Sequence, residues 1–426
     1  MLGEPGVHPG YWYIITAVEF AAADPRIAYA GSAVSIFRSE NGGHTWRMVS
    51  GGTRRWGPES TTAGIPIDFE IDPRDPDRIF VNCYGGGNFL STDGGRTWSD
   101  VSNGYTGAEA RDIAVHPSDP QQVLVAGRSG VFRSDDGGES WIAVASPTES
   151  FEWNVAAIDP ANPEHFLIGS NSWRGIFESF GPGSHPQIVA PDVWTTASRG
   201  FGWRAIAFAP SHPALVYAGT GAFVSSGFFS DFLPAKGIFR SNDGGSTWAP
   251  ANDPLSRDAH VAALAVDLSN PLVVYAATTN LGLLKTTDGG LSWTASNEGL
   301  PSGVAVLSVA CHPADPAIIF VGLDRAGIYR SSDGGASWRP SSAGLNPESI
   351  ISSIVIDPAQ PDILFTSDRM SGVYESIDGG STWSLRSRGL QMRDVNDLAI
   401  SSDGTVLYAA AEGGGVYRLD VADEEE

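Results

Sequence analysis

The chain has few cysteines, few methionines and little positive charge. Its 426 residues include 2 Cys and 4 Met. Cys83 and Cys311 fall on different predicted strands of different repeats, so we expect neither a disulfide nor a metal site between them. Two isolated cysteines also leave the redox compartment open.

Basic residues are fewer than acidic residues. There are 26 Lys and Arg against 49 Asp and Glu, which gives a net charge of −23. Nucleic-acid binding requires clustered Lys and Arg, and no basic stripe is present, so we expect no nucleic-acid partner. The negative charge favours solubility. Residues 421–426 are expected to form a solvated acidic tail.

Long apolar runs are absent as well. No stretch is long enough to span a membrane, and the N-terminal sequence MLGEPGVHPGYWY is not a signal peptide. The compartment stays open between a cytosolic protein and an exported one whose leader is not part of this sequence.

Glycine and a repeated motif are abundant. The chain has 51 Gly, and Ser/Thr-x-Asp-Gly-Gly-x-Thr/Ser-Trp recurs along it. Full copies lie at 91–98, 134–141, 241–248, 286–293, 331–338 and 376–383, and a copy with Asn41 in place of Asp lies at 39–46. The last four copies are 45 residues apart, a period typical of propeller blades.

Each repeat also contains an inner apolar strand that ends at a Pro-rich turn. Such strands begin near residues 18, 69, 113, 156, 206, 264, 309, 354 and 398. The sequence therefore predicts an all-β protein with a single β-propeller of four-stranded blades, nine in number with eight or ten as alternatives. We expect one domain over residues 1–426, closed by a strand from residues 5–13 because the ninth repeat stops after its third strand.

The motif resembles the Asp-box, or BNR repeat, of sialidases, two-propeller xyloglucan hydrolases, sortilin-type receptors and photosystem assembly factors. The resemblance covers about residues 14–420 and implies the fold. It does not imply one function, because these families include enzymes, receptors and binding proteins. It favours export over the cytosol. The Asp of each box is expected to hold its own turn and not to catalyse.

Five tryptophans lie outside the boxes and their remnant, all in the first half of the chain. Propeller geometry predicts that they form an exposed arc on the face opposite the boxes, where they would bind sugar rings or apolar side chains of a partner. The alternative is that they pack into the protein. These residues are Trp12, Trp56, Trp153, Trp173 and Trp203.

Acidic side chains break the pattern of the inner strands. Glu70 stands where the other repeats have Ala or Val, with Ala22 aligned there in the first repeat, and Asp68 precedes it on the same side of the strand. Asp112 and Asp397 occupy the position of Asp68 in other repeats, so carboxylates are expected to converge near the axis. They could act in glycoside hydrolysis, bind Ca²⁺, or pair with Arg111, Arg204 or Arg393.

Arginine recurs in the loop between the second and third strands, beside two aspartates. We include Arg128, Arg325, Arg369, Asp324 and Asp368 among the candidate ligand-binding residues. The leading hypothesis is a non-catalytic, monomeric recognition propeller that binds a glycan or an extended polypeptide without a cofactor, Ca²⁺ being the open alternative. The second hypothesis is a glycoside hydrolase that uses Asp68, Glu70 or Asp112, so the sequence leaves enzymatic activity open.

Overall fold

The structure is a computed structural model. It describes residues 14–52, 56–57, 65–84, 87–101, 109–128, 130–145, 153–170, 175–181, 186–189, 202–221 and 235–421. These residues form 35 strands and no helix. The strands make nine antiparallel sheets, which we call blades 1 to 9 in chain order; eight have four strands and blade 9 has three. The predicted all-β class and the nine sheets are confirmed.

The chain divides into two compact units. Unit 1 comprises Met1–Tyr105 with Ser146–Phe151, and unit 2 comprises Thr106–Ala145 with Glu152–Glu426. Unit 1 holds blades 1 and 2. Their strands are β1 (Ala17–Phe20), β2 (Ala28–Gly31), β3 (Ser35–Ser39) and β4 (Arg47–Gly51), then β5 (Ile65–Ile71), β6 (Ile79–Tyr84), β7 (Gly87–Ser91) and β8 (Ser99–Asp100).

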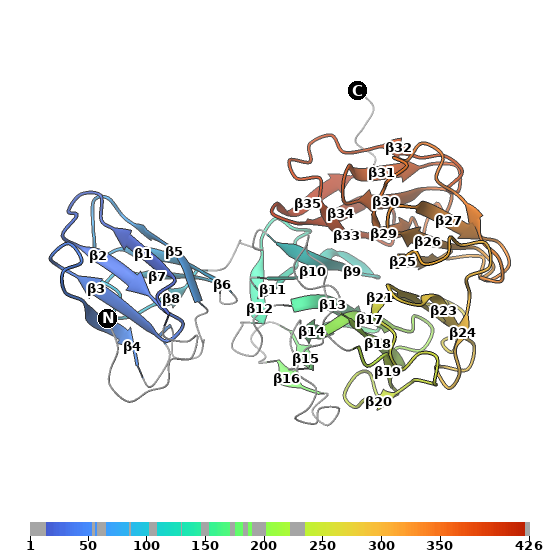
Figure 1. Ribbon diagram of the computed structural model, residues 1–426, viewed down its shortest axis with the longest axis horizontal. Coiled ribbons are helices and arrows are strands. Elements are labelled where there is room, and N and C mark those ends of the chain that lie inside the picture. The colour runs from blue at the N-terminus through green and yellow to red at the C-terminus, as the bar shows by residue number, and fades with distance from the viewer. Residues whose placement is uncertain are drawn as a thin grey trace. The chain divides into compact units, whose positions relative to one another are not determined.

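Unit 2 holds blades 3 to 9, whose inner strands gather around a common centre in Figure 1. Its strands are β9 (Ala110–His116), β10 (Asp119–Gly127), β11 (Gly130–Ser134), β12 (Ile142–Ala145), β13 (Trp153–Asp159), β14 (Asn162–Ser170), β15 (Ile176–Phe180), β16 (Gln187–Ile188), β17 (Gly202–Phe208), β18 (Val216–Gly221), β19 (Ile238–Ser241), β20 (Ala249–Pro250), β21 (Val261–Val266), β22 (Val274–Thr278), β23 (Gly282–Thr286), β24 (Thr294–Ala295), β25 (Val306–Cys311), β26 (Ile319–Leu323), β27 (Gly327–Ser331), β28 (Arg339–Pro340), β29 (Ile351–Ile356), β30 (Leu364–Asp368), β31 (Gly372–Ser376), β32 (Ser384–Leu385), β33 (Val395–Ile400), β34 (Val406–Ala411) and β35 (Gly415–Asp420).

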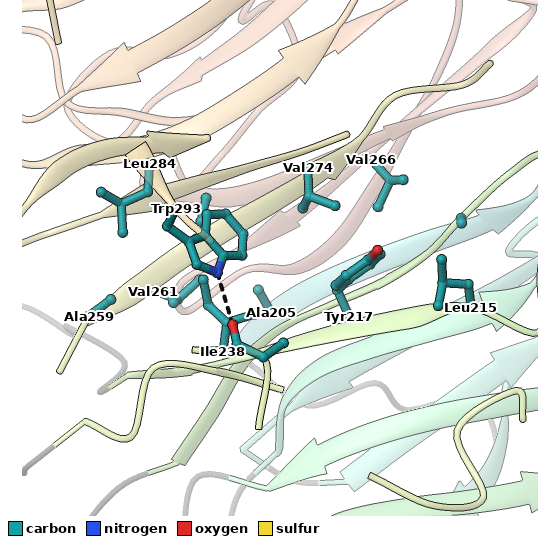
Figure 2. Packing of buried hydrophobic residues seen from close by; sticks show 13 residues of the cluster. Ala205, Leu215, Tyr217, Ile238, Ala259, Val261, Val266, Val274, Leu284 and Trp293 are labelled. Atoms are coloured by element: carbon teal, nitrogen blue, oxygen red, sulfur yellow. Dashed lines mark hydrogen bonds between the residues drawn. The ribbon is translucent and has the colours of Figure 1, made fainter. Parts of the chain in front are cut away.

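Hydrophobic packing between neighbouring sheets builds the core. Between blades 5 and 6, Tyr217 and Ile238 pack with Val261, Val274 and other aliphatic residues (Figure 2). The box Trp293 closes this cluster, and its indole N–H donates to the Ala251 carbonyl at 2.8 Å. Within unit 2, each sheet thus buries one face against the preceding sheet and the other against the following one.

The seven sheets of unit 2 close on themselves. Strand β33 of blade 9 lies against β9 of blade 3. At this seam the Asn396 amide donates to the Ala110 carbonyl at 2.9 Å, and the Tyr408 hydroxyl donates to the Gly137 carbonyl at 3.0 Å. The second contact repeats the one between blades 6 and 7, where the Tyr275 hydroxyl donates to the Gly334 carbonyl at 3.0 Å. The closure therefore differs from the expected single ring of nine. The proposed closing strand, residues 5–13, lies outside the described residues.

Blade 2 differs from the ring blades on the sheet face that carries Asn82 and Asn88. Strand register aligns Asn82 and Asn88 with small and aliphatic residues of every ring blade, such as Ala126 and Val131 of blade 3. The Asn82 amide donates to the Asn88 side-chain oxygen at 2.7 Å, so the two amides are partners of each other.

The inner strands also distinguish blades 1 and 2 from the seven blades of the ring. Glu70 pairs with Phe80, and Glu19 pairs with Tyr29, so Glu19 is the true equivalent of Glu70. The sequence alignment had placed Ala22 there, and the register corrects it. The two Glu-bearing sheets are the two of unit 1. The seven sheets of the ring have small or short side chains at this position: Ala114, Ala157, Ala207, Ala265, Ala310, Val355 and Ala399.

Candidate functional site at the mouth of the central channel

Each ring inner strand has a bulge near its start, and in five of the seven blades the extra residue is polar: Arg111, Asn154, Arg204, Ser352 and Asn396. In blades 6 and 7 the extra residue is Ala262 and Leu307. The ladder shifts between Trp153 and Val155 in blade 4 and between Val395 and Asp397 in blade 9. The extra residue is Asn154 in the first case, and its amide donates to the Trp203 carbonyl at 3.1 Å. Bulges of this kind redirect a side chain out of the regular alternation. Here they create a polar band between blades, at the end of the channel opposite the boxes.

The inner strands surround a cavity of about 640 Å³. Most of its wall is aliphatic, as at Ala114, Ile206 and Leu264. The charged and strongly polar residues in the wall all belong to the bulges or follow them directly. They are Arg111, Asp112, Arg204, Ser308, Ser352, Ser353, Asn396 and Asp397.

Two carboxyl groups meet in this band. Asp112 accepts a hydrogen bond from the Ala156 backbone N–H at 2.7 Å, and Asp397 accepts one from the Ile113 N–H at 3.1 Å. The two carboxyl groups also hydrogen-bond to each other. Burial, together with the neighbouring carboxylate, raises the pKa of Asp112 well above its usual range, and burial raises the pKa of Asp397. The pair therefore binds a proton more readily than two solvent-exposed aspartates do.

Arg204 lies beside this pair. Its burial lowers the pKa of the guanidinium to about 10, while the charges of Asp112 and Asp397 oppose that shift. At neutral pH the guanidinium remains charged. The group as a whole combines one buried cation with two buried carboxyl groups of raised pKa, next to an open cavity.

A second ion-pair group lies on the same side of blade 3. Glu109 accepts from Arg111 at 2.6 Å and from Arg128 at 3.0 Å. The Arg111 guanidinium also donates to the Asn154 side-chain oxygen at 3.0 Å. Arg111 is buried, whereas the Arg128 side chain is 46% exposed. Arg128 is thus a charged group at the rim that solvent and a ligand can reach.

The seam between blades 8, 9 and 3 is charged as well. Arg369 forms an ion pair with Asp394 at 2.7 Å. Glu412 accepts from the Asn396 amide at 3.0 Å, and burial raises the pKa of Glu412. Glu109, Asp394, Asn396 and Glu412 were missed from the sequence. Asn396 comes just before Asp397, as Arg111 comes just before Asp112. This equivalent position could have identified Asn396 from the sequence.

The predicted convergence of carboxylates is only partly present. Asp112 and Asp397 come together, as expected from their equivalent positions. Asp68 and Glu70 belong to unit 1, where both are exposed. The structure therefore does not unite Asp68, Glu70 and Asp112 within one compact unit. Arg111 and Arg204, proposed as partners of Glu70, instead lie in the cluster of unit 2.

The expected exposed arc of tryptophans is wrong for the three that the structure describes. Trp56 is 1% exposed, and Trp153 and Trp203 are 0% exposed. Trp153 packs edge-on against Phe177 at 5.1 Å between ring centroids, and Trp203 packs against Phe239 at 5.2 Å. The Trp56 indole N–H donates to the Ser32 carbonyl at 3.1 Å. The alternative, core packing, holds for these three because each fills space between sheets. Trp12 and Trp173 lie outside the described residues.

The loops between second and third strands have mixed roles. Asp368 is buried and accepts backbone N–H groups of Ile350 at 2.9 Å and Met370 at 3.2 Å, so it holds its loop. Arg325 is 67% exposed and 4.0 Å from Asp324. Among the described residues, Arg325 alone has a positive φ without being glycine, at 54°. Such a conformation is sparsely populated and is often found at functional sites.

The box aspartates support their turns. Asp333 accepts from the Ser331 hydroxyl at 2.7 Å, from the Ser337 N–H at 2.8 Å and from the Ser337 hydroxyl at 2.6 Å. These hydrogen bonds lower the pKa of Asp333 to about 2. Gly334 and Gly335 have φ values of 71° and 83°, which only glycine adopts without strain. All hydrogen bonds of this carboxylate are internal to the turn.

Two negative findings concern the described residues only. They contain no group of three or more His, Cys, Asp and Glu side chains that could hold a metal ion. They also contain no helix that is long and apolar enough to cross a membrane.

Comparison with known proteins shows the fold, and one family model matches part of the chain. The Sortilin-Vps10 family model, described as "Sortilin, neurotensin receptor 3", matches residues 34–173. The WD40 beta propeller domain of Doa1 is similar over 75% of this chain and 94% of that domain, with a TM-score of 0.54 and 15% identity. The fold is a β-propeller.

Two glycoside hydrolase structures also align with this propeller. They are the GH74 xyloglucanase from Xanthomonas campestris, at 18% identity, and the GH74 enzyme of Niastella koreensis, at 16% identity; each has a TM-score of 0.35. The alignments cover 95% and 96% of this chain. The chain spans 65% of the length of each of these structures. No curated protein sequence matches the propeller chain.

Proposed function

We propose that unit 2 is a non-catalytic recognition module that binds an extended polypeptide at the mouth of its channel, on the face opposite the boxes. The observation that supports this proposal is the buried charged group formed by Arg204, Asp112 and Asp397 against a cavity of about 640 Å³. Charged groups are desolvated here at a cost in folding free energy. A site of this kind, concave and with perturbed ionisable groups, is where ligands usually bind.

The fold itself does not require charges at this position. The other ring blades have short, uncharged residues at the place of Asp112 and Asp397 and still form the same bulge. They are Val155, Ala205, Ala263, Ser308 and Ser353. Departure from an otherwise regular repeat, at a cost in stability, favours a functional role.

A polypeptide fits this mouth better than a glycan. Sugar rings are commonly bound by exposed aromatic faces, and Trp153 and Trp203 are fully buried. What the rim offers is charge, from Arg128 and Arg325 in exposed positions and from the Asp394–Arg369 pair. Such groups match the backbone and charged side chains of an extended chain.

Glycoside hydrolysis is less compatible with the carboxylates at the mouth. A retaining enzyme needs its two carboxyl groups about 5 Å apart and an inverting enzyme needs them further apart. Asp112 and Asp397 are in direct hydrogen-bond contact, which leaves no room for a glycosidic bond between them.

The test is a peptide and glycan array probed with the full chain, followed by affinity measurements with the strongest peptide. Arg128→Ala and Arg325→Ala should each weaken that peptide by up to about tenfold, because each removes an exposed rim charge. Arg339→Ala, on the exposed strand β28, is the matched control and should have no effect. Binding to glycans alone, or release of reducing ends that disappears in Asp112→Asn, would reject the proposal.

A further inference from the structure

The wall of the central channel changes character along its length. The polar band lies at the mouth, and beyond it every lining residue that the structure describes is apolar. This apolar part includes Ala114, Ile206, Leu264, Val355 and Leu398. The cavity of about 640 Å³ falls within the usual size of ligand pockets, about 300–1,000 Å³. All of its lining residues belong to unit 2, so the cavity is complete within that unit.

The charged group of the polar band can be reached from the cavity. Asp112, Arg204 and Asp397 line the cavity, and each retains some solvent-accessible surface. The other cation of the band, Arg111, is already neutralised by Glu109 at 2.6 Å. One guanidinium therefore serves two carboxyl groups, and burial raises the pKa of both carboxyl groups even with Arg204 nearby. A further positive charge in the cavity would be stabilised here, and a further negative charge would not.

We propose that the channel receives the free N-terminus of the extended polypeptide, and that the first residue of this ligand is aliphatic. The inference rests on the proposed function and adds which part of the ligand enters the cavity. The α-ammonium group of the ligand binds the carboxyl groups of Asp112 and Asp397. Its first side chain occupies the apolar part of the channel, and the rest of the chain leaves through the mouth past Arg128 and Arg325, which are exposed.

The order of groups along the wall matches an N-terminal residue. Asp112 and Ala114 lie two residues apart on the same side of β9, so their Cα atoms are about 6.8 Å apart. Ala114 lies deeper in the channel, because the bulges mark the mouth end of the inner strands. The amine and the side chain of one residue share a Cα atom. A first residue whose amine contacts Asp112 therefore reaches the apolar wall with its side chain.

This arrangement favours a chain end over other cations and other termini. A lysine side chain that reached the carboxyl groups from the mouth would leave the apolar wall in contact with water. An N-terminal residue covers this wall with its own side chain, and removal of apolar surface from water stabilises the complex. A C-terminus carries a negative charge, which is unfavourable beside Asp112 and Asp397.

The test is isothermal titration calorimetry of the full chain with the peptide Leu-Gly-Ser-Glu-Ser-Gly. Acetylation of its N-terminus should weaken binding at least about tenfold, because it removes the positive charge. Replacement of its leucine by alanine should also weaken binding about tenfold, because apolar contact in the channel is lost. Amidation of its C-terminus should have no effect.

Three variants locate the site. Asp112→Asn keeps an acceptor for the Ala156 N–H and should remove most of the difference between the free and the acetylated peptide. Glu298→Gln is the matched control, because it removes an exposed carboxylate of unit 2 that does not line the cavity, and it should leave this difference unchanged. Ala114→Leu narrows the apolar part of the channel and should make the peptide that begins with alanine the tighter ligand. Near-ultraviolet circular dichroism checks that each variant is folded.

Several outcomes would overturn the inference. They are equal affinity for the free and the acetylated peptide, a preference for the free amine that persists in Asp112→Asn, and loss of binding on amidation of the C-terminus instead. In each case, weaker peptide binding by Arg128→Ala would leave the proposed recognition function intact, because the rim would still be used. Absence of binding by this peptide and by every peptide on the array would reject both proposals.

Discussion

The raised pKa of Asp112 and of Asp397 leads to a specific prediction for the variant Asp112→Asn. In the wild type the Asp112 carboxyl accepts from the Ala156 N–H at 2.7 Å and hydrogen-bonds to Asp397. An asparagine supplies the same pair of interactions, since its carbonyl oxygen accepts and its amide donates to the Asp397 carboxylate. It does so at every pH without binding a proton.

The sign of the pH effect follows from the raised pKa. Both carboxyl groups have a higher pKa in the folded protein than in the unfolded chain, so the folded state binds more protons above about pH 4. The free energy of unfolding therefore falls as pH rises, by about 1.4 kcal/mol per pH unit for one proton, until the pH passes the raised pKa. Asp112→Asn should reduce that slope by one proton and be as stable as the wild type, or more so, at pH 7.

The assay is urea unfolding of both proteins from pH 4 to pH 8, followed by tryptophan fluorescence. Asp112→Ala serves as the contrast, because it leaves the Ala156 N–H without its acceptor and should lower stability at every pH. If the pH dependence of Asp112→Asn is the same as that of the wild type, the pair holds no extra proton and the reasoning is refuted.

Three further predictions concern the scaffold. Asp243→Ala should lower the free energy of unfolding by about 2 kcal/mol through loss of its hydrogen bonds to Ser241 and Thr247, with peptide affinity unchanged, as measured by urea unfolding and titration. Trp203→Ala should lower it by about 4 kcal/mol because it opens a cavity beside Phe239, and binding by the folded fraction should persist. Cys311 should not react with a thiol reagent at pH 8 unless denaturant is added, since burial raises the pKa of its thiol to about 12.

The repeat pattern was sufficient to predict most of the fold. Box spacing and the apolar runs predicted nine sheets, because each is a local unit whose turn chemistry is written in consecutive residues. Closure was harder to predict, since it depends on which sheet faces are apolar. That Asn82 and Asn88 lie on one face of blade 2, for example, is visible only after the strand register is known. The sequence alignment also misplaced Glu19, because it matched the wrong proline in the turn after the inner strand.

The site shows a similar division. The equivalence of Asp112 and Asp397 was readable from the sequence, and the structure brings these residues together. Pattern alone did not predict that Trp153 and Trp203 point between sheets. A large side chain at the start of an inner strand looks the same in sequence whether it packs or is exposed. The partners Glu109 and Asn396 depend on bulges, which shift a strand by one residue without a distinct sequence signature.

The most direct test of the account is to produce residues 106–426 alone and measure both unfolding and peptide binding. The closed ring of seven sheets predicts one cooperative thermal transition and the same dissociation constant as the full chain for the peptide selected on the array. A protein that does not fold, or a folded one that has lost this binding, would contradict both the closure of unit 2 and the assignment of the recognition site to its channel mouth.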